Sequence, residues 1–280
     1  DAYHRAVLDY FRSEYLRGRT PNPCVVCNQA VKFGALLTAL QDHGIAFDYF
    51  ATGHYARVGF DHTRGRYALQ RGRDTAKDQS YFLSQLHQEQ LRRVLCPLGE
   101  YRKADVKRLA ERHGFAHLAA KKESQDFIES EQYDVLFAGR DLAPGPIVDL
   151  RGTVLGQHRG IVYYTVGQRK GLGIGGAGAP YYVVRIDACN NTIVVGRRAD
   201  VFSNTLTAGQ LNYIALERLE RPLRATVKIR QQHTAAPALV TPRDAASAFV
   251  TFDQPQMAIT PGQAVAIYDG DVVVAGGFIA

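Results

Sequence analysis

An abrupt change of sequence pattern near residue 126 constrains the fold of this chain more than any other feature. Before it, helical patterns such as 1–17 and 29–43 alternate with short apolar runs, of which 46–51 ends in a glycine turn at Gly53. A helix, a short apolar strand and a glycine turn in succession are typical of an α/β fold with a parallel sheet. Beyond it, glycine and proline become frequent and short β-rich runs take over. Closely spaced short strands predict a small β-barrel or sandwich.

The composition is that of an ordinary globular protein. The 280 residues correspond to about two domains, or to three small ones. Contents of 46% apolar and 22% charged residues exclude a disordered or fibrous chain. The formal net charge of +7 fits a polyanionic partner such as nucleic acid or a nucleotide, and it fits equally well a basic soluble protein without one.

Neither a membrane-spanning helix nor a signal peptide is expected. The longest apolar runs, such as residues 271–279, are far shorter than the roughly 20 residues that cross a bilayer. The chain opens on Asp1 inside an amphipathic helix pattern, and no charged and then apolar leader precedes it. Because the chain starts within an element, we expect it to be a fragment of a longer protein.

The cysteines predict a reducing compartment. Cys24 and Cys27 form a C-x-x-C pair, whereas Cys96 and Cys189 stand alone in the sequence. Four cysteines are too few for a disulfide framework in a chain of this length. We therefore expect a cytoplasmic protein.

The C-x-x-C pair is the sharpest chemical feature. It follows a Pro-Asn-Pro loop within 19–28, where two prolines argue against a regular helix, and it precedes the predicted helix 29–43. Zinc binding, dithiol redox chemistry and the handling of sulfur or iron–sulfur groups all use this spacing. Two partly buried thiols without a function remain the alternative. Cys27 lies close to the predicted helix N-terminus, which should lower the pKa of its thiol.

Other candidate binding residues stand in polar loops or on strands. Gly53 and His54 follow a predicted strand, where ligands of parallel sheets bind. The segment 77–79 (Lys-Asp-Gln) lies between a strand and a helix predicted over 80–95, and its residue types suit phosphate and ribose contacts. Lys228 and Arg230, two apart on a predicted strand, would share one face of the barrel. Solvated surface positions are the alternative for the 77–79 segment and for Lys228 and Arg230.

The glycine-rich segment 171–176 matches G-x-G-x-x-G but does not predict a dinucleotide site. That fingerprint must follow a strand directly and open a helix, whereas here Gln168-Arg169-Lys170 precedes it and a strand follows. A basic loop that touches an RNA backbone is the functional interpretation, and a plain glycine turn is the alternative.

Motifs along most of the chain fall in the order seen in the tRNA-specific 2-thiouridylases, which this sequence resembles. The matching segments are 18–28, 32–33, 51–56, 77–83, 97–99, 121–125, 144–145, 165–174 and 260–263. The resemblance implies an α/β domain of the PP-loop ATP pyrophosphatase fold (adenine nucleotide alpha hydrolase-like), without its N-terminal part, over 1–125. A small central domain over 126–204 and a C-terminal β-barrel over 205–280 would follow.

The resemblance also implies a reaction. The family uses ATP, with Mg²⁺, to adenylate O2 of uridine 34 in the tRNA anticodon, and a cysteine persulfide from a donor or relay protein then delivers sulfur while AMP leaves. This order is chemically reasonable because a carbonyl oxygen leaves poorly until it carries an adenylyl group. A cysteine of low pKa is the natural sulfur carrier.

Site residues are assigned by the same resemblance. Cys27 matches the catalytic cysteine, and Gly53 matches an ATP contact. Residues matched to contacts with the target base are Asn22, Pro23 and Cys24. Residues matched to other tRNA contacts are His54, Lys77, Asp78, Gln79, Arg230, Gln231 and Gln263.

Two departures from the family pattern bear on the mechanism. The ATP-phosphate loop, Ser-Gly-Gly-x-Asp-Ser, is absent from this sequence, as expected if it lies upstream of Asp1. The segment 124–128 (Ser-Gln-Asp-Phe-Ile) lacks the second cysteine usual in the family, and many relatives carry Asp where Cys24 stands. Our hypothesis is that Cys24 takes over the second thiol role, or that Cys24 and Cys27 ligate an iron–sulfur cluster together with an outside ligand.

Two alternatives to the sulfurtransferase remain. The first is a non-enzymatic tRNA-binding or sulfur-carrier protein that has lost ATP chemistry, and ATP-dependent release of AMP distinguishes it. The second is an RNA methyltransferase, which is disfavoured because no methyl-donor glycine loop follows a first strand.

Overall fold

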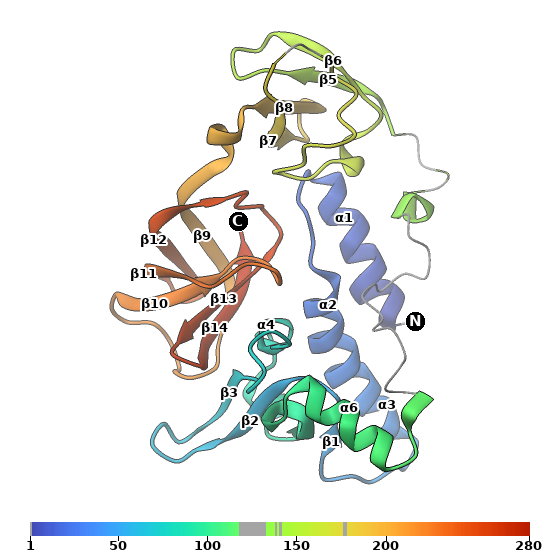
Figure 1. Ribbon diagram of the computed structural model, residues 1–280, viewed down its shortest axis with the longest axis vertical. Helices are drawn as coiled ribbons and strands as arrows, with labels where there is room; N and C mark the ends of the chain where they lie inside the picture. The colour runs from blue at the N-terminus through green and yellow to red at the C-terminus, as the bar shows by residue number, and fades with distance from the viewer. Residues whose placement is uncertain (1, 118–132, 138, 140–141, 176–177) are drawn as a thin grey trace.

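The computed structural model describes residues 2–117, 133–137, 139, 142–175 and 178–280 (Figure 1). A column of helices runs along one side of the molecule, a β-barrel packs beside its middle, and a small four-stranded sheet caps one end. The matching segment 121–125, the segment 124–128 and the predicted boundary between residues 125 and 126 lie outside the described residues.

Two helical stretches open the chain. The first consists of η1 (His4–Asp9) and α1 (Tyr10–Leu16). The second is continuous through α2 (Pro23–Val26), η2 (Cys27–Ala35) and α3 (Leu36–Asp42). The second stretch begins earlier than the predicted 29–43, because Pro23 occupies the first helical position, where its missing N–H costs nothing.

The stretch Pro23–Asp42 is long and apolar enough to cross a membrane by length and composition alone, although the apolar runs in the sequence predicted no such helix. Core helices meet the same criterion. This one buries Val25 and Phe33 in a cluster that also contains residues of the barrel strands.

A short parallel pair confirms the predicted α/β character. Strand β1 (Phe50–Ala51) pairs in parallel with β4 (Val94–Leu95), although the strand predicted over 46–51 is only two residues long. The helix predicted over 80–95 is wrong, because α4 (Ser80–Leu83) and α5 (Gln88–Leu91) are separate and β4 follows them. His87 separates the two helices in an extended conformation with ψ 164°, and Gln90 Oε1 accepts a hydrogen bond from its N–H over 3.0 Å. Further along, η3 (Pro97–Glu100) leads into α6 (Lys103–Arg112).

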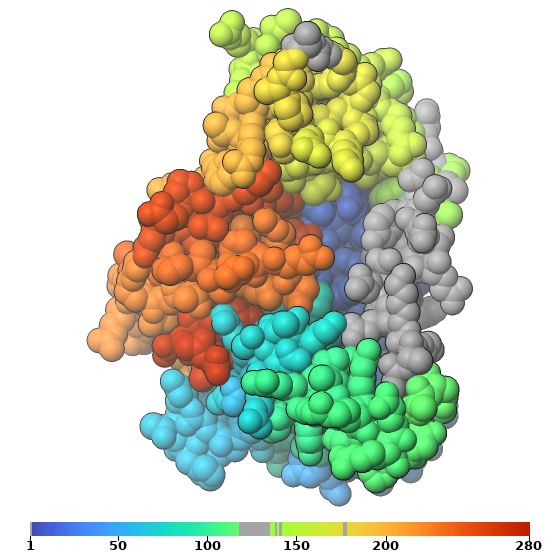
Figure 2. Space-filling model, in the orientation of Figure 1, coloured from blue at the N-terminus to red at the C-terminus, as the bar shows by residue number. Residues whose placement is uncertain are grey.

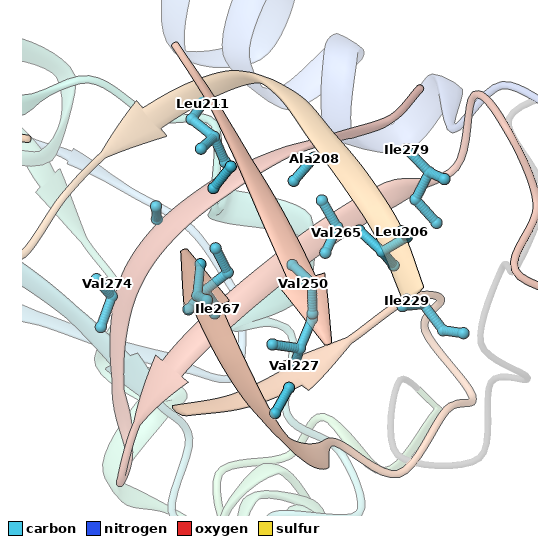
Figure 3. Close-up of a cluster of buried hydrophobic side chains, with 14 of the residues drawn as sticks. Leu206, Ala208, Leu211, Val227, Ile229, Val250, Val265, Ile267, Val274 and Ile279 are labelled. Atoms are coloured by element: carbon cyan, nitrogen blue, oxygen red, sulfur yellow. The ribbon is translucent and has the colours of Figure 1, made fainter. Parts of the chain in front are cut away.

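The C-terminal strands close into a six-stranded antiparallel barrel. Its strands are β9 (Phe202–Tyr213), β10 (Leu223–Lys228), β11 (Ala236–Asp244), β12 (Ser247–Met257), β13 (Ala264–Asp269) and β14 (Val272–Ile279). The pairing of β13 with β14 closes the ring, and aliphatic side chains such as Val227, Val250 and Ile267 fill its interior (Figure 3). The same sheet continues from β14 into β3 (Arg66–Arg71) and β2 (Ala56–Asp61), so strands of the N-terminal region extend the barrel sheet.

The small sheet lies between the two larger parts in sequence. Its strands are β5 (Gly145–Val148), β6 (Val154–His158), β7 (Tyr182–Asp187) and β8 (Thr192–Gly196), in the order β6-β5-β8-β7. Short 3₁₀ turns accompany it at η4 (Tyr133–Phe137), η5 (Ile161–Tyr163) and η6 (Arg198–Val201).

The described residues form three buried clusters, and two of them include residues of the helices on either side of the loop before the cysteines. The barrel interior forms one cluster. Phe11 of α1 belongs to the cluster of the small sheet. Val25 and Phe33 belong to a third cluster, together with Tyr81 of α4 and with Ala264 and Tyr268 from the barrel wall. The loop between α1 and α2 therefore joins two separate cores.

Candidate active site around the paired cysteines

Cys24 and Cys27 lie one turn apart at the start of the long helix. The N–H of Cys27 points to the carbonyl of Cys24, and both side chains are partly exposed and outside any disulfide. Residues three apart on a helix share a face, so the two thiols can serve one reacting group.

The predicted lowering of the Cys27 pKa is wrong. Because the helix begins at Pro23, Cys27 lies a full turn inside it, where the effect of the N-terminus has faded. Burial raises the pKa of the Cys27 thiol above its ordinary value, and the ammonium of Lys32 opposes that rise. Cys24, in the first turn, occupies the position that the prediction assigned to Cys27.

Lys32 links the cysteine face to the edge of the parallel sheet. The helix is of the π type over Cys27–Ala35, so residues five apart lie one turn above each other. The charge of Lys32 acts on Cys27 and also on His54. The ring of neighbouring Phe33 lies 5.8 Å from Phe50 of β1 and 5.9 Å from His54.

The carboxyl ends of β1 and β4 bring three polar side chains together. Thr52 Oγ1 lies 2.8 Å from His54 Nδ1 and 3.9 Å from Cys96 Sγ. Burial, reinforced by Lys32, lowers the pKa of His54 to about 4, so its imidazole is neutral at pH 7. Sequence reasoning assigned no role to Cys96, although its position directly after β4 was the available signal.

Gly53 lies at the same edge, as predicted. A Cβ built there would approach only Leu98 Cδ1, at 3.7 Å, among the described residues. The backbone at this point therefore leaves space in front of the strand ends.

Asn22 and Pro23 are buried at the start of the helix. Asn22 Oδ1 accepts a hydrogen bond from the N–H of Val25 over 3.3 Å, and its Nδ2 donates to Tyr81 Oη over 3.3 Å. The Asn22 side chain therefore caps the helix, and the predicted contact of Asn22 and Pro23 with a base stays a prediction.

The predicted segment 77–79 has three different surroundings. Asp78 is buried, and its carboxylate accepts hydrogen bonds from the N–H groups of Gly72 and Ser80. Gln79 Oε1 accepts from the N–H of Tyr55 over 3.0 Å. Lys77 is exposed. Of these three residues, only Lys77 is both positively charged and exposed, as a phosphate contact requires.

The structure brings the 77–79 segment to the barrel. Gln231 Nε2 donates to the carbonyl of Asp78 over 3.0 Å, and Figure 2 shows residues 72–79, in cyan, against the orange surface of the barrel. Arg230 lies beyond the end of β10, and its guanidinium donates to the carbonyl of Met257 over 3.0 Å. Arg230 therefore does not share the strand face with Lys228 that the sequence predicted.

Gln263 contacts a different part of the molecule from Arg230 and Gln231. Its Nε2 donates to the carbonyls of Thr20 and Pro21, each over 3.1 Å. It therefore contacts the loop that leads to the cysteines, whereas Arg230 and Gln231 lie with the 77–79 segment.

The resemblance and the cysteine pair imply ATP, Mg²⁺ and an iron–sulfur cluster as bound groups, and the described residues fit only ATP, and that in part. A Cβ at Gly53, which the resemblance matches to an ATP contact, would meet only Leu98 Cδ1 among the described residues, but the sequence contains no Ser-Gly-Gly-x-Asp-Ser loop for the phosphates. Within the described ranges, no cluster of three or more His, Cys, Asp or Glu side chains could hold a metal ion. Cys24 and Cys27 thus supply two ligands and not the set that an iron–sulfur cluster requires.

Comparison with known proteins gives a consistent result over the whole chain. Residues 1–129 match the family model described as tRNA methyl transferase HUP domain, and 134–197 match the tRNA methyl transferase PRC-barrel domain. Residues 203–279 match the aminomethyltransferase beta-barrel domain. The tRNA-specific 2-thiouridylase MnmA of Moorella thermoacetica is 48% identical over 284 residues, which cover 100% of this chain and 78% of that protein. The chain belongs to the tRNA-specific 2-thiouridylase family.

A second 2-thiouridylase relative agrees. The enzyme of Acetivibrio thermocellus is 46% identical over 284 residues, covering 100% of this chain and 78% of its own length. Membership of the 2-thiouridylase family confirms the resemblance on which the site was predicted. Although two family models carry the words methyl transferase, both relatives are named for thiolation, so the methyltransferase alternative is not favoured.

Proposed function

We propose that this protein is a tRNA-uridine 2-sulfurtransferase, which thiolates C2 of uridine 34 in the anticodon. Membership of the 2-thiouridylase family along the whole chain supports the substrate and the reaction. The observation that carries the proposal is the pair Cys24 and Cys27, one turn apart on a helix whose Phe33 packs against β1 and against His54 just beyond its end. The non-enzymatic alternative has no comparable support.

Cys27 acts as the catalytic thiol in this proposal, and Cys24 takes the second thiol role. A persulfide on Cys24 forms the bond from its outer sulfur to C2 as AMP leaves. The Cys27 thiolate then attacks the inner sulfur of Cys24 and frees the thiouridine. A Cys24–Cys27 disulfide remains, and two equivalents of an external thiol reduce it to two thiols while they form their own disulfide. Lys32 favours the Cys27 thiolate.

ATP, where bound, supplies the adenylyl group that makes the uridine oxygen a leaving group. Gly53 would lie against the nucleoside, because its lack of a side chain leaves the strand ends open. His54 remains neutral at pH 7 and can accept or donate a hydrogen bond at this edge without adding charge. We assign no step to Mg²⁺ or to an iron–sulfur cluster.

tRNA is bound, in this proposal, on the surface formed by residues 72–79 and the turn after β10. Lys77 and Arg230 supply cations for backbone phosphates. The basic net charge of +7 supports a polyanionic partner. A persulfide donor or relay protein in a reducing cytoplasm would load Cys24, the compartment that four cysteines without a disulfide framework favour.

The experiment measures thiolation directly. The protein from its complete reading frame is incubated with ATP, a persulfide source and an unmodified tRNA transcript, and AMP and 2-thiouridine are quantified. Formation of both supports the sulfurtransferase, and tRNA binding without AMP release supports the non-enzymatic alternative. Cys27→Ser and Cys24→Ser are each expected to abolish 2-thiouridine, with Cys189→Ser as the matched control. Unchanged turnover in Cys24→Ser would exclude the second thiol role of Cys24.

A further inference from the structure

The loop that precedes the cysteine helix is held from both sides. Gly18 lies in the left-handed region at φ +72°, and a Cβ there would come within 2.9 Å of Ile186 of the small sheet. Thr20 Oγ1 lies 3.2 Å from Thr165 Oγ1. The N–H of Thr20 donates to the carbonyl of Pro261 over 2.8 Å. The small sheet and the barrel therefore both contact a few residues just before Cys24.

The barrel makes a second contact through Gln263. Its Nε2 donates to two successive carbonyls, those of Thr20 and Pro21. Gly262 packs against the same loop, since a Cβ there would lie 2.9 Å from the Thr20 carbonyl oxygen. Backbone contacts of this kind fix where the chain enters the helix.

A third connection runs through the phenol of Tyr81. Tyr81 Oη donates to the carbonyl of Ala264 in β13 over 2.9 Å and accepts from Asn22 Nδ2 over 3.3 Å. Asn22 Oδ1 in turn accepts from the N–H of Val25, within the first turn of the helix. Tyr81 is fully buried, so water cannot replace it in this chain of hydrogen bonds.

We infer that Tyr81 and Gln263 are positioning residues, through which the C-terminal barrel holds the first turn of the helix and thereby Cys24 and Cys27. This inference rests on the proposed function, in which both thiols react. An N-cap stabilises the first turn of a helix, and a misplaced reacting group lowers the rate by up to about 100-fold. The barrel would then serve both to bind tRNA and to hold the thiols in place.

The first test is Tyr81→Phe, which keeps the ring and removes the hydroxyl. Tyr268→Phe is the matched control, because its buried hydroxyl bonds Ser80 Oγ over 3.1 Å and lies outside the chain of hydrogen bonds from Ala264 through Tyr81 to Asn22. We expect amide hydrogen exchange at Val25 to become about tenfold faster in Tyr81→Phe and to stay unchanged in Tyr268→Phe. We also expect kcat for thiolation to fall about tenfold, with KM for tRNA within twofold.

The second test is Gln263→Met, which also covers the case in which Tyr81→Phe does not fold. A positioning residue predicts a lower kcat with an unchanged KM, whereas a direct tRNA contact predicts a higher KM with an unchanged kcat. The second pattern would overturn the role of Gln263. Equal exchange at Val25 in Tyr81→Phe and Tyr268→Phe would overturn the role of Tyr81.

The two readouts separate this inference from the proposed function. Exchange at Val25 is measured without ATP or tRNA, so it reports the hydrogen-bond chain alone. If exchange responds to Tyr81→Phe while the wild-type protein thiolates no tRNA, the proposed function fails and the structural connection stands. If the wild type thiolates tRNA and neither variant changes kcat, the positioning role is wrong and the proposed function stands.

Discussion

His54 Nδ1 lies 2.8 Å from Thr52 Oγ1, where β1 ends. Burial and the charge of Lys32 lower the pKa of this imidazole to about 4. The folded protein therefore keeps His54 neutral over a pH range in which the unfolded chain, with an ordinary pKa near 6.5, takes up a proton.

The free energy of unfolding should fall as the pH is lowered from about 6.5 to about 4. Above this range His54 is neutral in both states and has no effect on pH dependence. Within it, the unfolded state binds a proton that the folded state excludes, which costs up to about 3 kcal/mol in total. Urea unfolding of the wild type and of His54→Gln at pH 7 and pH 5 measures this, and the variant should show the smaller loss.

His233 supplies the control, because burial also lowers the pKa of its imidazole. His233→Gln removes that separate contribution, and the double variant should show the sum of the two changes. A pH dependence in His54→Gln equal to that of the wild type would contradict a neutral His54.

Lys32 should control the reactivity of Cys27. Lys32→Met removes the charge that opposes the burial-raised pKa, so the pKa of Cys27 should rise further and less thiolate should be present at pH 8. We expect alkylation of Cys27 by iodoacetamide to slow several-fold, measured by mass spectrometry in a Cys24→Ser background. Lys107→Met, on the exposed face of α6, is the matched control.

The pH profile of alkylation distinguishes this effect from altered access. A shifted midpoint with an unchanged plateau at high pH indicates a changed pKa, whereas a lower plateau indicates reduced access to the thiol. A lower plateau without a shifted midpoint would show that Lys32 does not act on the pKa of Cys27.

Gly262 should be far less tolerant of alanine than Gly270. Both have positive φ, +88° and +57°, so a side chain costs about 1–2 kcal/mol of backbone strain at each. A Cβ at Gly262 would also lie 2.9 Å from the Thr20 carbonyl oxygen, whereas at Gly270 nothing described lies within 4 Å. We expect Gly262→Ala to lose at least about 1 kcal/mol more in urea unfolding. Equal losses of unfolding free energy in the two variants would show that the loop before Cys24 moves to accommodate the added Cβ at no cost.

Local sequence patterns predicted the fold class well, because each short strand and helix carries its own apolar periodicity. The parallel pair at β1 follows from such patterns, which also predicted a barrel or a sandwich, and the resemblance chose the barrel. The helix start at Pro23 did not, since proline is disruptive inside a helix and favourable at its first position. The break at His87 was also missed, because the burial of Leu83 and Leu86 in one tertiary cluster overrides helical spacing.

The sequence predicted which residues form the candidate site, but it did not predict their burial or their hydrogen-bond partners. Resemblance supplied Cys27 and Gln263, but only the fold shows that burial raises the pKa of the former and that the latter bonds the Thr20 and Pro21 carbonyls. Asp78 reads as a polar loop residue in sequence, yet the structure buries it among N–H donors. Burial of a polar side chain depends on contacts from distant segments, which periodicity does not encode.

Lys77 and Arg230 should each contribute one phosphate contact to tRNA binding. We expect Lys77→Ala and Arg230→Ala to weaken tRNA affinity and to reduce the slope of log K against log salt by about 1 each. Arg224→Ala is the matched control, because its guanidinium already pairs with Asp253 at 2.6 Å. Filter binding between low and high salt measures the slopes. Since the 72–79 segment and the barrel are joined through Gln231 and Asp78, slopes unchanged in both variants would move the tRNA-binding surface away from this junction.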